Sequence, residues 1–181
     1  MTYRDPKVAL RTLTEVAASQ GGCFTARQAD EAGYDAPHLS YQLGAGNIER
    51  VGHGLYRLPS LPPSEHDDLV RLWLWSRGRD DRPQAVVSHQ TALVLHDLAE
   101  FIPRAIHLTV PPGFRKRAPE GCVLHKSSLD ARQTQPIGPL PVTTPLRTLR
   151  DLAGDPSLPA EQFTHAVRVA AARGLIGAGG P

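Results

Sequence analysis

Side chains that can hydrogen-bond DNA recur in the stretch 35–58. Residues 35–45 predict a helix with Asp35 as its N-cap and with Leu39 and Leu43, four positions apart, on its buried side. At about 100° per residue, the outward face and its flanks carry His38, Ser40, Tyr41 and Gln42. Each of these four side chains can hydrogen-bond a base edge or a phosphate, so this helix is a candidate for reading DNA.

The sequence RVGHGLYRL, residues 50–58, predicts a small β-hairpin. Apolar and polar residues alternate on both sides of the turn 52–54, which contains two glycines. The outward positions hold Arg50, His53 and Arg57. Cations at the base and tip of such a ribbon are well placed for phosphates or a minor groove. Because so short a ribbon is marginal alone, it must pack on neighbouring helices.

Two further helices precede this pair of elements. Asp5 and Pro6 begin the first, which Gly21 and Gly22 stop, and Thr25 with Gln28 forms a capping box for the second, which Gly33 ends. Three short helices followed by a hairpin predict a winged helix-turn-helix domain over residues 1–60. The same order also serves in protein-binding modules, and residues 1–60 are neutral, with six Lys and Arg against six Asp and Glu. Both readings stay open on these grounds.

The second half of the chain alternates helical and strand patterns. PSLPPS at 59–64 predicts a linker, and a second domain is expected over 65–175. Strands are predicted at 85–88, 106–110, 123–125 and 140–142, and helices at 65–77, 90–98, from 144 onward and at 162–173. The whole chain is thus expected to be an α/β (α+β) protein, with a winged helix-turn-helix followed by a mixed α/β domain.

Positive charge is concentrated in residues 101–150, which hold eight Lys and Arg against two Asp and Glu. The core of this excess is PPGFRKR, residues 111–117, in a proline- and glycine-containing loop beside a predicted strand. The candidate second basic surface consists of Arg104, Arg115, Lys116, Arg117 and Lys126, with Arg132 beside it. Such a surface suits an acidic partner, either a phosphate backbone or an acidic protein.

Possible catalytic groups are scattered. Ser88-His89 and His96-Asp97 resemble parts of a hydrolase triad, but the chain lacks the G-x-S-x-G elbow. His89 and His96 are seven positions apart, whereas paired metal ligands on a helix are four apart. Cys23 and Cys122 form no C-x-x-C motif and are interpreted as reduced thiols. We therefore expect no enzymatic activity, no metal and no cofactor.

The sequence also indicates the compartment. No run approaches the roughly 18 apolar residues of a membrane span, and MTYRDPKVAL lacks the apolar core of a signal peptide. We expect a cytoplasmic protein without membrane contact.

Four motifs in order resemble one family. GGCFTARQADEAGYDAPHLSYQLGAGNIERVGHGLYRLP is similar to the N-terminal winged helix of AbiEi-type antitoxins of type IV toxin–antitoxin systems. VVSHQTALVLHDL, IHLTVPPGFRKR and LPVTTPLRTLRDLAG resemble the C-terminal antitoxin domain of the same family. The resemblance covers roughly residues 8 to 175. One departure is that the predicted reading helix has no Lys or Arg between Asp35 and Asn47, where relatives are often arginine-rich.

The resemblance implies a non-enzymatic antitoxin that neutralises a co-encoded nucleotidyltransferase toxin and represses its own operon at inverted repeats. The implied partners are double-stranded operator DNA and the cognate toxin. Ser40, Tyr41, Arg50, His53 and Arg57 become DNA contacts in this reading, and Arg104 with 115–117 becomes the functional surface of the second domain. The alternatives are a protein-binding module with little DNA binding and a stand-alone winged-helix transcriptional regulator.

Overall fold

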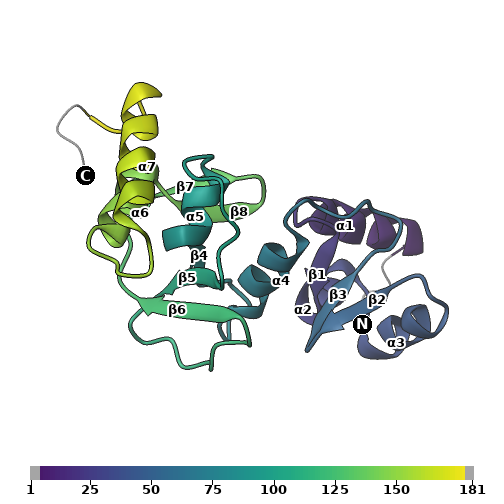
Figure 1. Ribbon diagram of the computed structural model, residues 1–181. Helices are drawn as coiled ribbons and strands as arrows, with labels where there is room; N and C mark the ends of the chain where they lie inside the picture. The colour runs from purple at the N-terminus through teal and green to yellow at the C-terminus, as the bar shows by residue number, and fades with distance from the viewer. Residues whose placement is uncertain (1–4, 178–181) are drawn as a thin grey trace. The chain divides into compact units, whose positions relative to one another are not determined.

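The computed structural model describes residues 5–177 and divides the chain into two compact units, Met1–Pro83 and Gln84–Pro181. We call these the N-terminal and the C-terminal unit (Figure 1). The predicted mixed α/β class is confirmed, since each unit combines helices with one sheet. The division lies later than the expected linker at 59–64, and the helix after that linker belongs to the N-terminal unit.

The N-terminal unit begins with three helices, α1 (Pro6–Ala18), α2 (Ala26–Ala32) and α3 (Ala36–Gly44). Their predicted caps are present. The Asp5 side chain accepts from the backbone N–H of Lys7, Thr25 and Gln28 form the reciprocal capping box, and Asp35 accepts from the N–H of His38. Caps of this kind satisfy backbone donors that a helix start leaves free, and they fix where each helix begins.

A three-stranded antiparallel sheet completes the winged helix. β1 (Cys23–Thr25) pairs with β3 (Leu55–Arg57), and β3 pairs with β2 (Glu49–Gly52), so the central strand is β3. The predicted hairpin is β2 and β3, but β1 was not expected. The core beneath contains fully buried Phe24 and Leu13, with Leu39 of α3 packed against the same cluster.

The N-terminal unit also includes α4 (Asp67–Trp75), which packs against all three strands of its sheet. Leu69, Val70 and Leu74 are buried, and the two acidic residues of the first turn suit the positive end of the helix. The N-terminal unit therefore contains this helix as well as the elements expected over residues 1–60.

The C-terminal unit is built on a five-stranded mixed sheet in the order β6-β5-β4-β8-β7. Its strands are β4 (Val86–Val87), β5 (Ile106–Val110), β6 (Cys122–Lys126), β7 (Thr134–Ile137) and β8 (Leu140–Thr143), with a short 3₁₀-helix at Ala131–Gln133. β4 is central, antiparallel to β5 and parallel to β8. β5 and β6 are parallel, and the segment 111–121 connects them without a helix.

Three helices belong to this sheet: α5 (His89–Leu95), α6 (Pro145–Leu152) and α7 (Ala160–Ala172). α5 packs against β5 and β8, α6 against α5, and α7 against α6. The shared core contains Leu93, Leu149 and Ala166, all fully buried. Thr144 caps α6, and Pro145 follows at its first position, as predicted.

Candidate nucleic-acid interface

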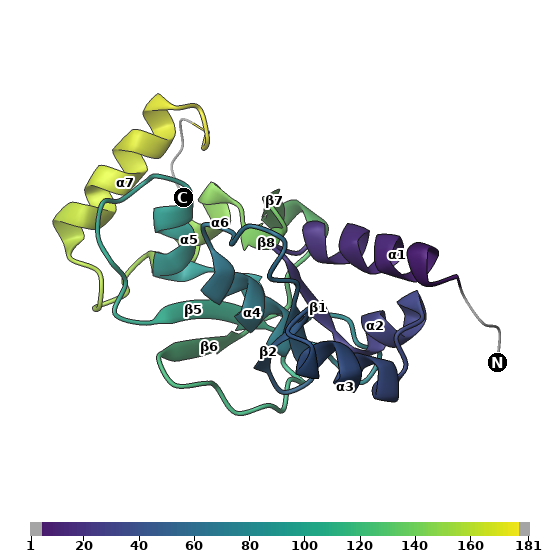
Figure 2. The ribbon, with the colours of Figure 1, turned by 90° about the vertical axis from the view of Figure 1, so that its right-hand side faces the viewer.

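The outer side of α3 presents the polar residues that the sequence predicts there. Leu39 anchors the helix in the core, whereas Ser40 is exposed and Tyr41 is 70% exposed. In two views at right angles, α3 and β2 lie side by side (Figures 1 and 2). The predicted reading helix and the hairpin of this unit are therefore neighbours, as a winged helix requires.

His38 and Gln42 are less free than their neighbours on α3. The His38 ring stacks on Tyr34 at a centroid distance of 4.5 Å, and its Nε2 lies 3.0 Å from Gln42 Nε2. Asn47, just beyond the helix, donates from Nδ2 to Gln42 Oε1 at 2.8 Å. This His38–Gln42–Asn47 network holds the glutamine amide in one orientation. Sequence reasoning did not include Asn47, because a residue after a helix end gives no facial pattern.

The hairpin, which we call the wing, exposes two of its three predicted residues. Arg50 is exposed, and its Nε donates to the carbonyl of Gly52 at 3.3 Å. The pairing of β2 with β3 shifts register between Arg50 and Gly52, which re-aims the strand near its turn. His53 is exposed at the turn itself.

Arg57 departs from the prediction of an outward wing cation. It lies on the central strand between Cys23 and Glu49, and its side chain is only partly exposed. Its Nη2 donates to the carbonyl of Leu61 at 3.2 Å, and its Nε is buried without a hydrogen-bond partner. Neighbouring backbone covers the side chain: a Cβ built at Gly22 would lie 3.5 Å from Arg57 Nε, and the Leu61 carbonyl accepts from Arg57 Nη2.

The resulting face carries little fixed charge. Among the residues predicted to contact DNA on α3 and the wing, Arg50 is the exposed arginine. Asp35 and Glu49 are also exposed nearby. Since charge is sparse, this face offers a partner hydrogen bonds from α3 more than cations that could neutralise phosphates.

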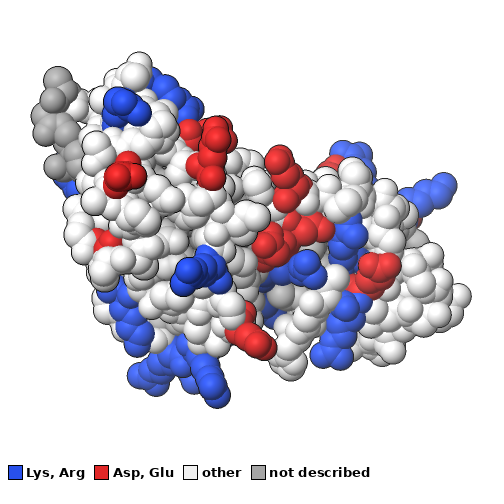
Figure 3. Space-filling model, in the orientation of Figure 1, with Lys and Arg blue, Asp and Glu red and all other residues white. Residues whose placement is uncertain are grey.

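The residues of the predicted second basic surface lie in more than one setting. Arg115, Lys116 and Arg117 are exposed in the β5–β6 connection, and Phe114, 5% exposed, anchors that connection. We call residues 115–117 the basic loop. Figure 3 shows Lys and Arg side chains gathered at the end of the C-terminal unit below β6. Lys126 is exposed at the end of β6.

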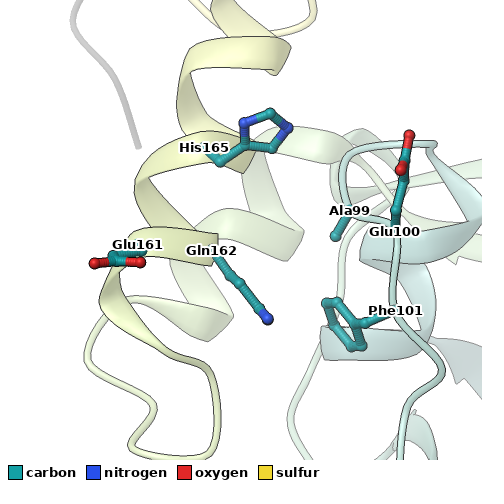
Figure 4. A pocket seen from close by; sticks show the side chains of 6 residues that line it. All are labelled: Ala99, Glu100, Phe101, Glu161, Gln162 and His165. Atoms are coloured by element: carbon teal, nitrogen blue, oxygen red, sulfur yellow. The ribbon is translucent and has the colours of Figure 1, made fainter.

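Arg104 lies in a different setting. It lines a hollow of about 530 Å³ together with Phe101, His107 and Gln162, and no residue of the basic loop lines that hollow. A smaller hollow of about 220 Å³ lies beside α7 (Figure 4). Gln162 and Phe101 point toward each other across it, whereas the Glu161 carboxylate points away.

Three histidines that sequence reasoning did not combine meet where α5 begins. The His89 and His125 rings stack at 3.5 Å between centroids, and His107 Nδ1 lies 3.0 Å from His125 Nε2. We call these residues the histidine cluster. Burial, with His125 and His107 close by, lowers the pKa of His89 to about 4. Burial also lowers the pKa values of His107 and His125. The cluster is therefore neutral at pH 7.

The structure separates the groups that resembled a hydrolase triad. His89 Nδ1 lies 3.0 Å from the hydroxyl of Ser88, which is fully buried and accepts a hydrogen bond from Thr109. His96 instead bonds the carbonyl of Thr143 through Nε2 at 2.7 Å, and Asp97 is exposed. Within residues 5–177, no group of His, Cys, Asp or Glu is arranged to hold a metal ion. No helix in that range is long and apolar enough to span a membrane.

Comparison with known proteins supports the N-terminal geometry. The family model described as "Transcriptional regulator, AbiEi antitoxin" matches residues 11–59, from α1 to the end of the wing. No curated protein matches the chain in sequence.

One similar solved structure is the crystal structure of the RV2827C protein from Mycobacterium tuberculosis. It superposes with a TM-score of 0.51 at 20% identity, covering 86% of this chain and 63% of that chain. This chain thus spans less than two thirds of that protein, and the similarity concerns the fold. From the family match and the geometry of α1 to the wing, we conclude that residues 11–59 form an N-terminal domain of the AbiEi antitoxin family of transcriptional regulators.

Proposed function

We propose that the protein is an antitoxin that neutralises a co-encoded nucleotidyltransferase toxin and represses its own operon by binding inverted repeats in double-stranded DNA. The observation that carries the repressor half is the exposed polar side of α3 beside the wing. The family of residues 11–59 supports DNA and a toxin as general partners. Since the proposed operator lies in the cytoplasm, we propose a cytoplasmic location. We propose no catalytic role.

In this proposal α3 enters the major groove. Ser40 and Tyr41 are free to meet base edges or phosphates, and Gln42 presents an amide whose orientation His38 and Asn47 hold. Arg50 and His53 of the wing lie against the adjacent backbone or minor groove. Arg57 supports the sheet and does not contact DNA, because its guanidinium donates to Leu61 inside the unit.

For the C-terminal unit we propose that the basic loop meets the toxin. Its three cations are consecutive and exposed, and the buried Phe114 fixes the base of the loop. A surface of this kind steers and orients an acidic partner. We leave Arg104 outside it, because Arg104 lines a separate hollow.

Fluorescence anisotropy with a duplex from the region upstream of the gene tests the repressor half. We expect Arg50→Ala to weaken binding and to lower the slope of log K against log salt by about 0.9 if Arg50 neutralises one phosphate. Tyr41→Ala should weaken binding with the slope unchanged, because Tyr41 carries no charge. Arg11→Ala, which removes an exposed arginine of α1 paired with Glu15, is the matched control. Unchanged affinity in both Arg50→Ala and Tyr41→Ala would refute this interface.

One observation favours a second candidate, a protein-binding module with little DNA binding. α3 carries no Lys or Arg, and Arg57 does not add its charge to the wing face. Co-purification with the product of the neighbouring gene, without any shift of the upstream duplex, would select that candidate. A duplex shift without a nucleotidyltransferase gene nearby would select a stand-alone regulator.

A further inference from the structure

A side chain from beyond α4 holds the turn of the wing. Arg77 donates from Nη2 to the carbonyl oxygens of His53 at 3.0 Å and Gly54 at 3.2 Å. Its Nη1 donates to the carbonyl of Leu74 at 2.9 Å, at the C-terminal end of α4. One guanidinium thus connects α4 to the tip of the wing, although more than twenty positions separate them in the sequence.

Asp81 fixes the orientation of that guanidinium. Its Oδ1 lies 2.9 Å from Arg77 Nε, and the two side chains are only 17% and 14% exposed. Asp81 also has a φ of +62°, which is uncommon for a residue with a side chain. Such a conformation persists where the surroundings over-determine it, and such residues cluster at functional sites.

Thr25 links the same pair to the helix-turn-helix. Its hydroxyl donates to Asp81 Oδ2 and accepts from the N–H of Gln28 as the cap of α2. The first residue of α2, Ala26, donates its N–H to the carbonyl of Gly54 at 3.1 Å. The Gly54 carbonyl therefore accepts from both α2 and Arg77, and the wing turn is tied to two elements.

We propose that Thr25, Arg77 and Asp81, which we call the wing clamp, are positioning residues for DNA binding. The clamp orders the wing before DNA arrives, so that binding does not have to fix the ribbon. Arg77 does not contact DNA, because its guanidinium nitrogens already bond Leu74, the wing turn and Asp81. The inference rests on the proposed function, in which the wing contacts the operator.

The test compares Arg77→Gln and Asp81→Asn with Arg79→Gln in the full-length chain. Arg79→Gln removes the same charge two positions away from an exposed side chain. With the upstream duplex, we expect the two clamp variants to bind about tenfold more weakly, because networks of this kind couple by roughly 1 to 2 kcal/mol and 1.4 kcal/mol is tenfold. Their salt slope should fall toward that of Arg50→Ala, because a wing without the clamp loses part of the Arg50 phosphate contact, whereas Arg79→Gln should bind like the parent.

Hydrogen exchange reports on the free protein. We expect the amides of 49–57 to exchange faster in the clamp variants, while those of 36–44 in α3 keep their protection. Asp81→Asn is the milder variant, since the amide keeps the shape of the carboxylate, and it serves if Arg77→Gln does not fold. Faster exchange throughout the N-terminal unit would mean general destabilisation and would overturn the proposal.

A double-mutant cycle separates positioning from general stability. If the clamp positions the wing, the loss caused by Arg50→Ala shrinks in the Arg77→Gln background; additive losses would overturn the inference. If Arg77→Gln lowers the slope by about a further 0.9 in the Arg50→Ala background, Arg77 itself contacts a phosphate, and the inference is also overturned. If the parent chain binds the duplex and the clamp variants bind it equally well, the wing-clamp proposal is refuted but the proposed function is not. If the parent chain does not bind the duplex at all, the proposed function fails as well.

Discussion

Two structural constraints meet at Gly54 in the wing turn. Its φ is +60°, a conformation that side chains rarely adopt. A Cβ built there would lie 2.8 Å from Arg77 Nη2, so an alanine must also displace the guanidinium. Backbone conformation and close approach therefore both require glycine at this position.

We predict that Gly54→Ala lowers the free energy of unfolding more than Gly46→Ala does. Gly46 has a φ of +74°, but a Cβ at that position would have no neighbouring atom within 4 Å, so its alanine variant carries the backbone strain alone. We expect a cost of about 1 kcal/mol for Gly46→Ala and about 1 kcal/mol more for Gly54→Ala. Urea unfolding measures both. Equal costs would mean that Arg77 moves aside freely.

Residue types and local spacing account for the caps and for much of the reading face. Asp35, Thr25 and the exposed Tyr41 follow from rules that act within four or five positions. The position of Arg57 and the role of Arg77 do not follow from such rules. Each depends on which segment lies beside the side chain, Gly22 for Arg57 and the wing turn for Arg77, and no local pattern encodes that neighbour.

At the scale of elements, α5, β5 and β6 each bring one imidazole to the histidine cluster. His107 and His125 lie on adjacent parallel strands, and His89 begins α5 with a φ of +52°. The carboxylates of Asp155 and Asp151 raise the pKa of His125, but burial lowers it more. The charge of Arg147, which pairs with Asp151 at 2.8 Å, further lowers the pKa of His89. The packed arrangement therefore favours three neutral rings.

We predict that the C-terminal unit loses stability as the pH falls. A histidine in the unfolded chain has a pKa of about 6.5. Below that pH the unfolded chain binds protons that the histidine cluster of the folded chain does not bind, so acid favours unfolding. The stability that the neutral cluster contributes is complete above about pH 6.5 and is lost progressively toward about pH 4, the pKa of His89 in the folded state. Differential scanning calorimetry between about pH 7 and about pH 5 measures this decline.

A matched pair of variants assigns the effect. His125→Gln removes one ring from the cluster and should flatten the pH dependence, because fewer imidazoles then have a lowered pKa. His165→Gln, on the exposed side of α7, should leave the pH dependence unchanged. A pH profile that is the same in both variants would show that other groups cause the decline.

Helix signals predicted elements better than strand signals did. The helices α1, α2 and α3 have caps and periodic apolar residues, and the structure places them as expected. The strands β1 and β7 were missed. β1 has three residues that are all buried, and β7 contains Pro136, so neither shows the apolar–polar alternation of a half-buried strand. Pairing with a distant partner defines both.

At the scale of the molecule, the two units carry separate parts of the proposed function. We predict that Arg50→Ala impairs repression of a promoter fusion but still neutralises the toxin. Replacing Arg115, Lys116 and Arg117 by glutamine should have the opposite effect, because charge steering of the toxin is lost while α3 and the wing are intact. Growth on toxin co-expression and reporter output from the upstream region measure the two activities in the same cells.

A control for the triple variant removes three exposed arginines elsewhere, at Arg132, Arg150 and Arg168. It lowers the net charge equally and should retain both activities. If each of the two test variants impairs both activities, the units do not act separately, and the division of labour proposed here is wrong.

The order of the C-terminal strands bears on how the protein folds during synthesis. β4 leaves the ribosome first but lies at the centre of its sheet, and its partner β8 ends only at Thr143. The N-terminal unit, by contrast, has every partner of its wing once Asp81 has emerged. Domains generally fold as units from the N-terminus. In a nascent chain, the N-terminal unit can therefore be folded while β4 still lacks its partners β5 and β8. That interval is when the apolar pair Val86–Val87 is most open to aggregation or to capture by a chaperone.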